Sequence, residues 1–166
     1  MHKVVVMGVS GCGKSTLGEA LARELGCVLI EGDEHHLPAS KAKMRAGIPL
    51  QDADREPWLD HLGALVAASS GGAVLTCSAL KRAYRERLRS HVPGLKFVFI
   101  EIEQADAVER VATRPAHMFP PSLVANQFAT LESPAGERGV VVVSARQTLS
   151  TQVDAVRDGL AQLAAT

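Results

Sequence analysis

Short apolar runs alternate with amphipathic stretches along most of the chain. The runs lie near residues 3–8, 27–31, 73–77, 96–102 and 140–144. Most are followed by residues whose apolar positions recur three and four apart, which is the spacing of one buried helix face. Continuously apolar strands are typical of a parallel sheet that is covered on both faces. The pattern therefore predicts a three-layer α/β/α fold around a five-stranded parallel sheet.

Helix boundaries follow from capping and breaking residues. Helices are predicted over 16–25, over 38–47, from Asp54, from Ser78, from Ser122 and over 149–164. Asp54 and Ser78 are placed to cap their helices, and Pro57 is tolerated because it falls in a first turn. No internal repeat, low-complexity tract or linker interrupts the chain. We therefore expect a single domain over 1–166.

Composition and charge narrow the choice of partner. The chain has 166 residues, of which 46% are apolar, enough for one core and short for two. Its 18 basic and 18 acidic residues cancel, which argues against nucleic acid or an acidic membrane as partner. No stretch approaches the roughly 18 apolar residues of a membrane span, and no signal peptide is recognisable. A small-molecule partner is expected.

The cysteines indicate a reducing environment. Cys12, Cys27 and Cys77 form neither a paired framework nor a close metal-binding cluster. A cytoplasmic location fits such unpaired thiols. A thiol at a helix N-terminus, as predicted for Cys12, could have a lowered pKa; the simpler interpretation is a small residue at a tolerant position.

Residues 8–15 read GVSGCGKS and lie between the first apolar run and the first predicted helix. This context is what a phosphate-binding loop requires, because its glycines let backbone amides approach phosphate oxygens at a helix N-terminus. Lys14 would reach the β- and γ-phosphates, and the Ser15 hydroxyl would ligate Mg²⁺. The alternative is an ordinary glycine turn with a solvated Lys14. The predicted ATP-binding residues are Gly8, Val9, Ser10, Gly11, Cys12, Gly13, Lys14, Ser15 and Thr16.

The second apolar run ends in the sequence EGDEHH, residues 31–36. Ligands of parallel sheets lie beyond the carboxyl ends of the strands, so Asp33 is expected beside the phosphate loop. There it could accept a proton from a substrate hydroxyl, or it could simply form a turn after Gly32. His36 is either a hydrogen-bonding wall of the substrate pocket or a solvated loop histidine. The spacing is too crowded for a dedicated zinc site.

Several cations are candidates for binding anionic groups. Arg45 and Arg55 could grip an anionic substrate or form surface ion pairs, and we favour a role for Arg55. Lys81 lies nearest a second strand-to-helix turn and is the further candidate. The rest of the charged run over 81–89 is predicted to be a solvated helix face.

Arg110 and Arg114 are four residues apart on a predicted helix and therefore share a face. A proline-bounded segment follows and suggests a mobile lid over about residues 114–122. The arginines either stabilise a transferring phosphoryl group or belong to an ordinary solvated helix end.

A phosphate loop alone does not separate a kinase from a GTPase switch or a motor ATPase. Short length, Asp33 after the second strand and a double arginine before the lid favour a small-molecule kinase. No N-K-x-D guanine-reading stretch is present.

Two stretches are more specific than the phosphate loop. Residues 52–59 read DADREPWL and residues 77–85 read CSALKRAYR. Together with matches in 7–15, 32–36 and 127–134, they resemble the gluconokinases, small phosphate-loop kinases related in fold to shikimate and nucleoside monophosphate kinases. The chain departs from that family around its substrate loop and lid.

The resemblance implies Mg²⁺-dependent phosphorylation of D-gluconate by ATP, giving 6-phospho-D-gluconate, in a cytoplasmic homodimer. The expected catalytic residues are Lys14, Asp33, Arg110 and Arg114. The expected substrate-binding residues are Asp33, His36, Arg45, Arg55, Lys81 and His117, several of them in an insert over about 34–60. Two alternatives stay open: a kinase of another small hydroxylated acceptor such as shikimate or a nucleotide, and a non-catalytic ATP-binding sensor.

Overall fold

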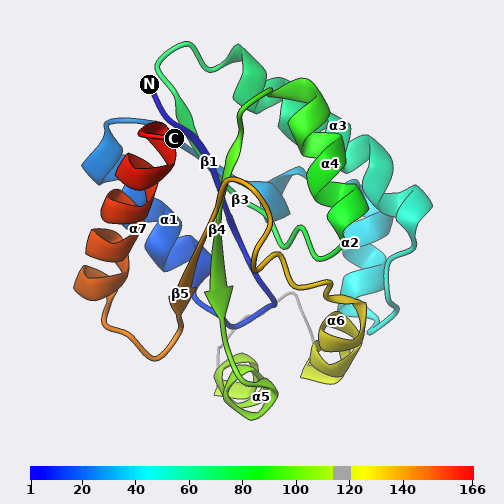
Figure 1. Cartoon of the computed structure of the whole chain (residues 1–166). Coiled ribbons are helices and arrows are strands. Elements are labelled where there is room, and N and C mark those ends of the chain that lie inside the picture. Colours follow the sequence, from blue (N-terminus) through cyan, green and yellow to red (C-terminus); the bar gives the residue numbers. More distant parts are fainter. Residues whose placement is uncertain (114–120) are drawn as a thin grey trace.

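One parallel five-stranded sheet forms the centre of the molecule (Figure 1). The computed structural model describes residues 1–113 and 121–166. The strands are β1 (Lys3–Met7), β2 (Val28–Glu31), β3 (Ala73–Thr76), β4 (Lys96–Glu101) and β5 (Val140–Ser144). Their order is β2-β3-β1-β4-β5, and every neighbouring pair is parallel. The predicted sheet is confirmed.

Helices lie on both sides of this sheet, as predicted (Figure 1). They are α1 (Lys14–Leu25), α2 (Pro38–Arg45), α3 (Asp52–Ala68), α4 (Arg82–His91), α5 (Gln104–Thr113), α6 (Val124–Thr130) and α7 (Leu149–Ala164), with short 3₁₀ turns η1 (Gly32–His35) and η2 (Pro121–Leu123). The predicted lid lies outside the described residues except for its last two, which belong to η2. No helix in the described part of the chain is long and apolar enough to span a membrane.

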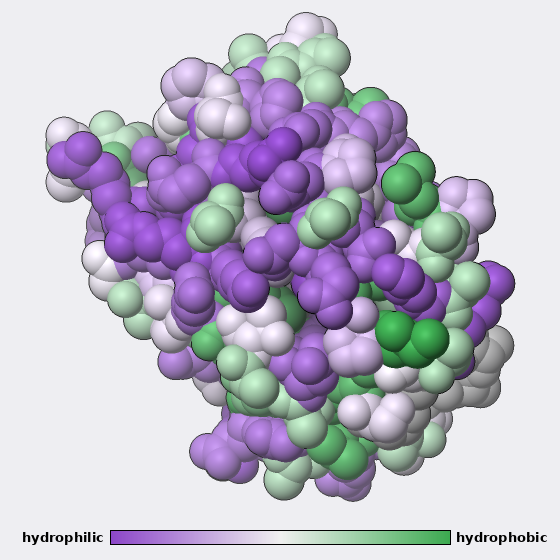
Figure 2. All heavy atoms as spheres, turned by 90° about the vertical axis from the view of Figure 1, so that its right-hand side faces the viewer, coloured by the Kyte–Doolittle hydropathy of each residue, from purple (hydrophilic) through white to green (hydrophobic). Residues whose placement is uncertain are grey.

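Alternating side chains of the strands feed two apolar clusters. Val4 and Val6 of β1 pack with α1 and α7 on one face, whereas Val5 and Met7 pack with α3 and α4 on the other. Trp58 belongs to the second cluster, as predicted, and is 3% exposed. The outer surface on the α3 and α4 side is mainly hydrophilic with scattered apolar residues (Figure 2). These helices therefore turn their apolar side toward the sheet.

The start of α3 differs from the prediction. The helix begins at Asp52, and Gln51 is its N-cap. The carboxylate of Asp54 accepts a hydrogen bond from the Gln51 backbone N–H at 2.8 Å, so Asp54 completes a capping box from the third helical position. Pro57 consequently lies in the second turn and removes one helical hydrogen bond.

The start of α4 was also predicted wrongly. The helix begins at Arg82, and Ser78 does not cap it. Residues 77–81 form a loop instead, in which Ala79 has a φ of 46°, the only positive φ of a non-glycine residue in the described ranges. The guanidinium of Arg85 donates to the carbonyls of Ala79 and Leu80 in this loop. Arg85 is 0% exposed, so the predicted solvated face over 81–89 is wrong at this position.

Gly32 gives a test of the packing between β2 and β3. A Cβ added at Gly32 would lie 2.2 Å from the Thr76 carbonyl oxygen, a backbone atom that cannot move aside cheaply. Gly32→Ala should lower the free energy of unfolding by about 1–3 kcal/mol, the cost of overpacking. Gly71→Ala is the control, because a Cβ there meets nothing within 4 Å. Urea denaturation of both variants measures the difference, and equal stability would contradict this packing.

Candidate active site

The loop between β1 and α1 has the conformation that its glycines predict. Gly13 has a φ of 99° and precedes the first residue of α1. A Cβ at Gly8 would lie 2.7 Å from the Cys12 sulfur, so the loop closes tightly there. The Lys14 ammonium folds across the loop and donates to the carbonyls of Gly8 and Val9 at 2.9 and 3.0 Å. The backbone N–H groups at the start of α1 can donate hydrogen bonds to an anion.

Gln127 of α6 reaches the same loop. Its Oε1 atom accepts a hydrogen bond from the Ser10 backbone N–H at 2.6 Å. From the sequence we expected this helix to serve mainly in packing. Nothing local to Gln127 indicates that its side chain contacts a loop 117 residues earlier. The contact joins the segment after the predicted lid to the phosphate loop.

Glu31 is a further residue that sequence reasoning missed. Its carboxylate accepts hydrogen bonds from Ser15 Oγ at 3.1 Å and from Thr76 Oγ1 at 2.6 Å. It therefore joins the end of β2 to the end of β3 and the start of α1. An acidic residue at the last position of the strand was the available signal. In the described ranges no group of three or more His, Cys, Asp or Glu side chains is placed to hold a metal. The Ser15 hydroxyl and the Glu31 carboxylate are oxygen atoms of the kind that hard cations prefer.

Asp33 and His36 follow β2 in and after η1. The His36 ring stacks on Trp58 with 4.0 Å between centroids, and its Nε2 lies 3.6 Å from Asp33 Oδ1. Trp58 Nε1 donates to the Gly32 carbonyl at 2.8 Å, so one indole supports both the histidine and the turn that carries Asp33. The His36 side chain is only 4% exposed, which excludes the solvated loop histidine. Its Nδ1 has no hydrogen-bond partner in the described part of the chain.

Cys77, at the end of β3, shows which charges converge on this edge of the sheet. Burial raises the pKa of its thiol to about 12. The negative charge of Asp33 raises this pKa further, whereas the positive charges of Lys14 and Arg55 lower it. These three charged groups come from the phosphate loop, from the turn after β2 and from the start of α3.

Arg55 and Lys81, which the sequence offered separately as candidate cations, are linked through Tyr84 and Asp52. Arg55 Nη1 lies 3.3 Å from the Tyr84 hydroxyl, which donates to Asp52 Oδ1 at 2.5 Å. Lys81 Nζ donates to the same carboxylate oxygen at 3.2 Å. The hydrogen bonds from Tyr84 and Lys81 lower the pKa of Asp52, which is therefore an anion at neutral pH. Arg45 is exposed at the end of α2 and makes no ion pair with any described residue.

Arg110 lies against the outside of the phosphate loop. Its guanidinium donates to the Gly11 and Cys12 carbonyls at 3.3 and 3.4 Å, and to the Ala145 carbonyl at 3.1 Å. The side chain thus joins α5 to the phosphate loop and to the segment after β5. Arg114 and His117, the other two predicted site residues of this region, lie outside the described residues.

Known proteins share this arrangement. A family model described as an AAA domain matches residues 4–134. The gluconokinase of Gluconobacter oxydans (strain 621H) is 48% identical over 145 residues, which cover 85% of this chain and 81% of the relative. This chain belongs to the gluconokinase family. The resemblance seen in the sequence is confirmed.

Solved structures separate the family from its wider fold. A gluconokinase from Sinorhizobium meliloti 1021 is 47% identical, covers 98% of this chain and 93% of its own, and has a TM-score of 0.89. A shikimate kinase from Aquifex aeolicus vf5 has a TM-score of 0.65 at 17% identity, so it shares the fold alone. The fold is that of the small phosphate-loop kinases.

Cys12 has the simpler of its two expected roles. Cys12 is 1% exposed, and burial raises the pKa of its thiol. The positive charges of Lys14 and Arg110 lower this pKa by a smaller amount. A reactive thiol needs a lowered pKa and access to solvent. The expectation of a lowered pKa at Cys12 is therefore wrong.

Alkylation of the native protein tests this environment. At pH 8, iodoacetamide should modify the partly exposed Cys27, while Cys12 and Cys77 react at least about 100-fold more slowly because both are buried as neutral thiols. Peptide mass spectrometry after timed quenching measures the three rates. Alkylation in urea is the control and should modify all three. Fast native labelling of Cys77 would contradict the packing of the site.

Proposed function

We propose that the protein transfers the γ-phosphoryl group of ATP to D-gluconate, giving ADP and 6-phospho-D-gluconate. The observation that carries the proposal is family membership at 48% identity to a gluconokinase, combined with a phosphate loop after β1 and an acidic turn after β2 of the same parallel sheet. Gluconate offers a terminal hydroxyl for phosphorylation and a carboxylate at its other end. Both ends have chemically suitable partners among the residues described above.

Nucleotide binding falls to residues 8–16. The backbone amides of the loop and of the first turn of α1 hold phosphate oxygens, and the Lys14 ammonium exchanges its two loop carbonyls for the β- and γ-phosphates. A bound Mg²⁺ neutralises phosphate charge during transfer. Its protein ligand would be the Ser15 hydroxyl, with Glu31 alongside as an oxygen acceptor for a metal-bound water. This oxygen-rich setting fits Mg²⁺ and not a thiol-binding metal.

Asp33 orients the acceptor hydroxyl or takes its proton. Its carboxylate is exposed and lies near the end of β3, where the charge of Lys14 is also felt. Phosphoryl transfer passes through a loose transition state, so alignment of the hydroxyl with the γ-phosphoryl matters more than strong deprotonation. Trp58 and the stacked His36 restrict where the acceptor can lie.

Arg55 and Lys81 bind the carboxylate or the hydroxyls of the sugar acid. Both cations already face Asp52 and Tyr84, so an incoming anion finds two positive charges held at a fixed separation. Asp52 in turn can accept hydrogen bonds from substrate hydroxyls. We retain Arg45 and His117 as candidate substrate contacts from the family resemblance.

Arg110 and Arg114 are proposed to neutralise charge that develops during transfer, one of them on the transferring phosphoryl. The position of Arg110 beside the phosphate loop supports proximity to the nucleotide. A cytoplasmic location is proposed because the three cysteines are free thiols. Three features stay predictions from the sequence: a mobile lid over about 114–122, a single domain over 1–166 and a homodimer.

The acceptor is tested by comparing substrates. In a coupled ADP-release assay, kcat/KM for D-gluconate should exceed that for shikimate and for a nucleoside monophosphate by at least about 100-fold. The reason is that a different acceptor leaves some of the cations and hydrogen-bond acceptors of the site without a partner. Turnover of shikimate without turnover of gluconate would replace the proposed acceptor by the alternative one.

Asp33→Asn separates a kinase from a non-catalytic ATP-binding sensor. The variant should lower kcat for gluconate by about 10²–10⁴-fold if the carboxylate takes the proton, and by less if it only orients the hydroxyl. Glu34→Gln is the matched control, since Glu34 is the adjacent exposed carboxylate of the same turn. ATP affinity should stay near that of the parent in both variants. Tight ATP binding without gluconate turnover in the parent itself would instead favour the sensor.

A further inference from the structure

Arg85 of α4 is the largest side chain that the described residues bury completely. Its guanidinium makes five hydrogen bonds, which match the five N–H donors of an arginine. The acceptors are the carbonyls of Ala79 at 2.8 Å, Leu80 at 3.2 Å and Glu132 at 2.9 Å, and both carboxylate oxygens of Glu137 at 3.2 and 2.5 Å. Such complete pairing of a buried charge is rarely needed for stability alone, because apolar residues of similar volume usually serve as well.

Three of the acceptors are backbone carbonyls, so Arg85 fixes chain conformation. Ala79 is held at a φ of 46°, which a non-glycine residue adopts at a cost. The Leu80 carbonyl also accepts from the Glu132 backbone N–H at 2.8 Å, and the Glu132 carboxylate accepts from the Arg82 N–H at the start of α4. Arg85 therefore joins residues 77–81 to the segment after α6 through hydrogen bonds to both.

The loop of residues 77–81 borders the candidate active site at both of its ends. The Ser78 carbonyl accepts a hydrogen bond from the Gly8 backbone N–H at 3.3 Å, which places it against the first glycine of the phosphate loop. Lys81 at the other end donates to Asp52 beside Arg55 and Tyr84. A shift of this loop would move a phosphate-loop amide and a substrate-binding cation together.

We propose that Arg85 is a positioning residue for phosphoryl transfer, which acts through the loop of residues 77–81 on Gly8 and Lys81. The proposal rests on the kinase function proposed above and extends it to a side chain that touches neither nucleotide nor acceptor. Displacement of reacting groups by about 1 Å can cost about 100-fold in rate, so a rigid loop has a direct kinetic value.

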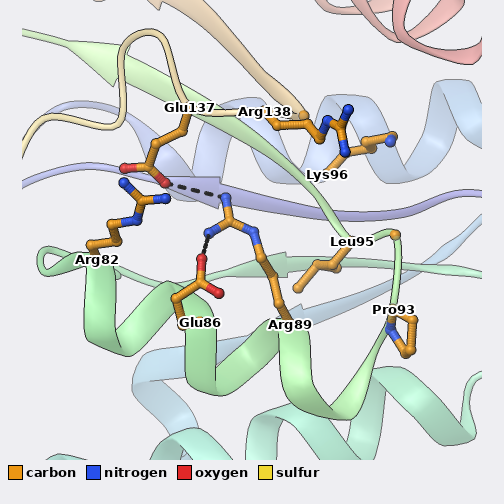
Figure 3. A pocket seen from close by; sticks show the side chains of 10 residues that line it. Arg82, Glu86, Arg89, Pro93, Leu95, Lys96, Glu137 and Arg138 are labelled. Atoms are coloured by element: carbon orange, nitrogen blue, oxygen red, sulfur yellow. Dashed lines mark hydrogen bonds and ion pairs between the residues drawn. The ribbon is translucent and has the colours of Figure 1, made fainter. Parts of the chain in front are cut away.

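Arg89, one helical turn further along α4, provides a matched control. It pairs with Glu86 and with Glu137, which it shares with Arg85 (Figure 3). Its guanidinium also packs over the Phe97 ring, 4.6 Å from the centroid. It touches none of the carbonyls of residues 77–81. Glu137 lines a surface cavity of about 290 Å³ with Arg82 and Arg138, and its side chain is 10% exposed. Burial alone would raise the pKa of Glu137, but the hydrogen bonds and charges of Arg85 and Arg89 lower it, so both ion pairs persist at neutral pH.

Arg85→Lys and Arg89→Lys together test the proposal. Lysine keeps the charge but lacks the planar fork that reaches two carbonyls and a carboxylate at once. At a temperature where circular dichroism shows both variants folded, Arg85→Lys should lower kcat/KM for gluconate by about 10- to 100-fold, with a raised KM, whereas Arg89→Lys stays within about twofold of the parent. Hydrogen–deuterium exchange over residues 77–81 should accelerate only in Arg85→Lys.

Each outcome bears on the proposal. Parental kinetics in folded Arg85→Lys, or equal losses in both variants, would overturn it, because the effect would then be absent or common to the Glu137 ion pairs. If Arg85→Lys does not fold, the double variant Arg85→Met with Glu137→Met removes both charges and should show the same raised KM; an unchanged KM overturns the proposal. If the parent itself fails to phosphorylate gluconate, the proposed function fails instead. The role of Arg85 is then decided by two measurements on both variants: hydrogen–deuterium exchange over residues 77–81, and the affinity for ATP.

Discussion

The parallel order of β2, β3 and β1 is the constraint on which the candidate site depends. Because neighbouring parallel strands end at the same edge of the sheet, three separate stretches of sequence meet there. The phosphate loop follows β1, Asp33 follows β2, and the loop that carries Lys81 follows β3. Two of these loops touch directly, since the Gly8 backbone N–H donates to the Ser78 carbonyl at 3.3 Å.

Polar contacts link these three strand ends to one another and to the helices beside them. Glu31 joins the end of β2 to Thr76 and to Ser15, and the Trp58 indole supports the Gly32 carbonyl from the α3 layer. Arg85 does the same for the third loop from the α4 layer. Unpaired polar groups in these positions would be costly, so each side chain restricts the backbone to one arrangement. Precise alignment is what phosphoryl transfer requires of a protein.

Features that follow from local pattern were predictable from the sequence. The strands follow from apolar runs, and the phosphate loop follows from glycine spacing. Arg55 and Lys81 were singled out separately as cations, and the sequence did not predict that Tyr84 and Asp52 link them. Two of the errors lie where distant segments decide, whereas the start of α3 is a local error between Gln51 and Asp54. Ser78 satisfies every local rule for a helix cap, yet Arg85 donates to the neighbouring carbonyls and the chain there forms a loop. Gln127 accepts a hydrogen bond from a loop 117 residues earlier in the sequence. A solvated and a buried arginine have the same local spacing, so only tertiary partners distinguish them.

The most direct test of the account is a crystal structure with D-gluconate and a non-hydrolysable ATP analogue bound together. The γ-phosphoryl should lie on the amides of residues 8–16, with the terminal hydroxyl of gluconate between it and the Asp33 carboxylate. The gluconate carboxylate should lie near Arg55 or Lys81. An Asp33 carboxylate turned away from the γ-phosphoryl, with no room for an acceptor between them, would contradict it.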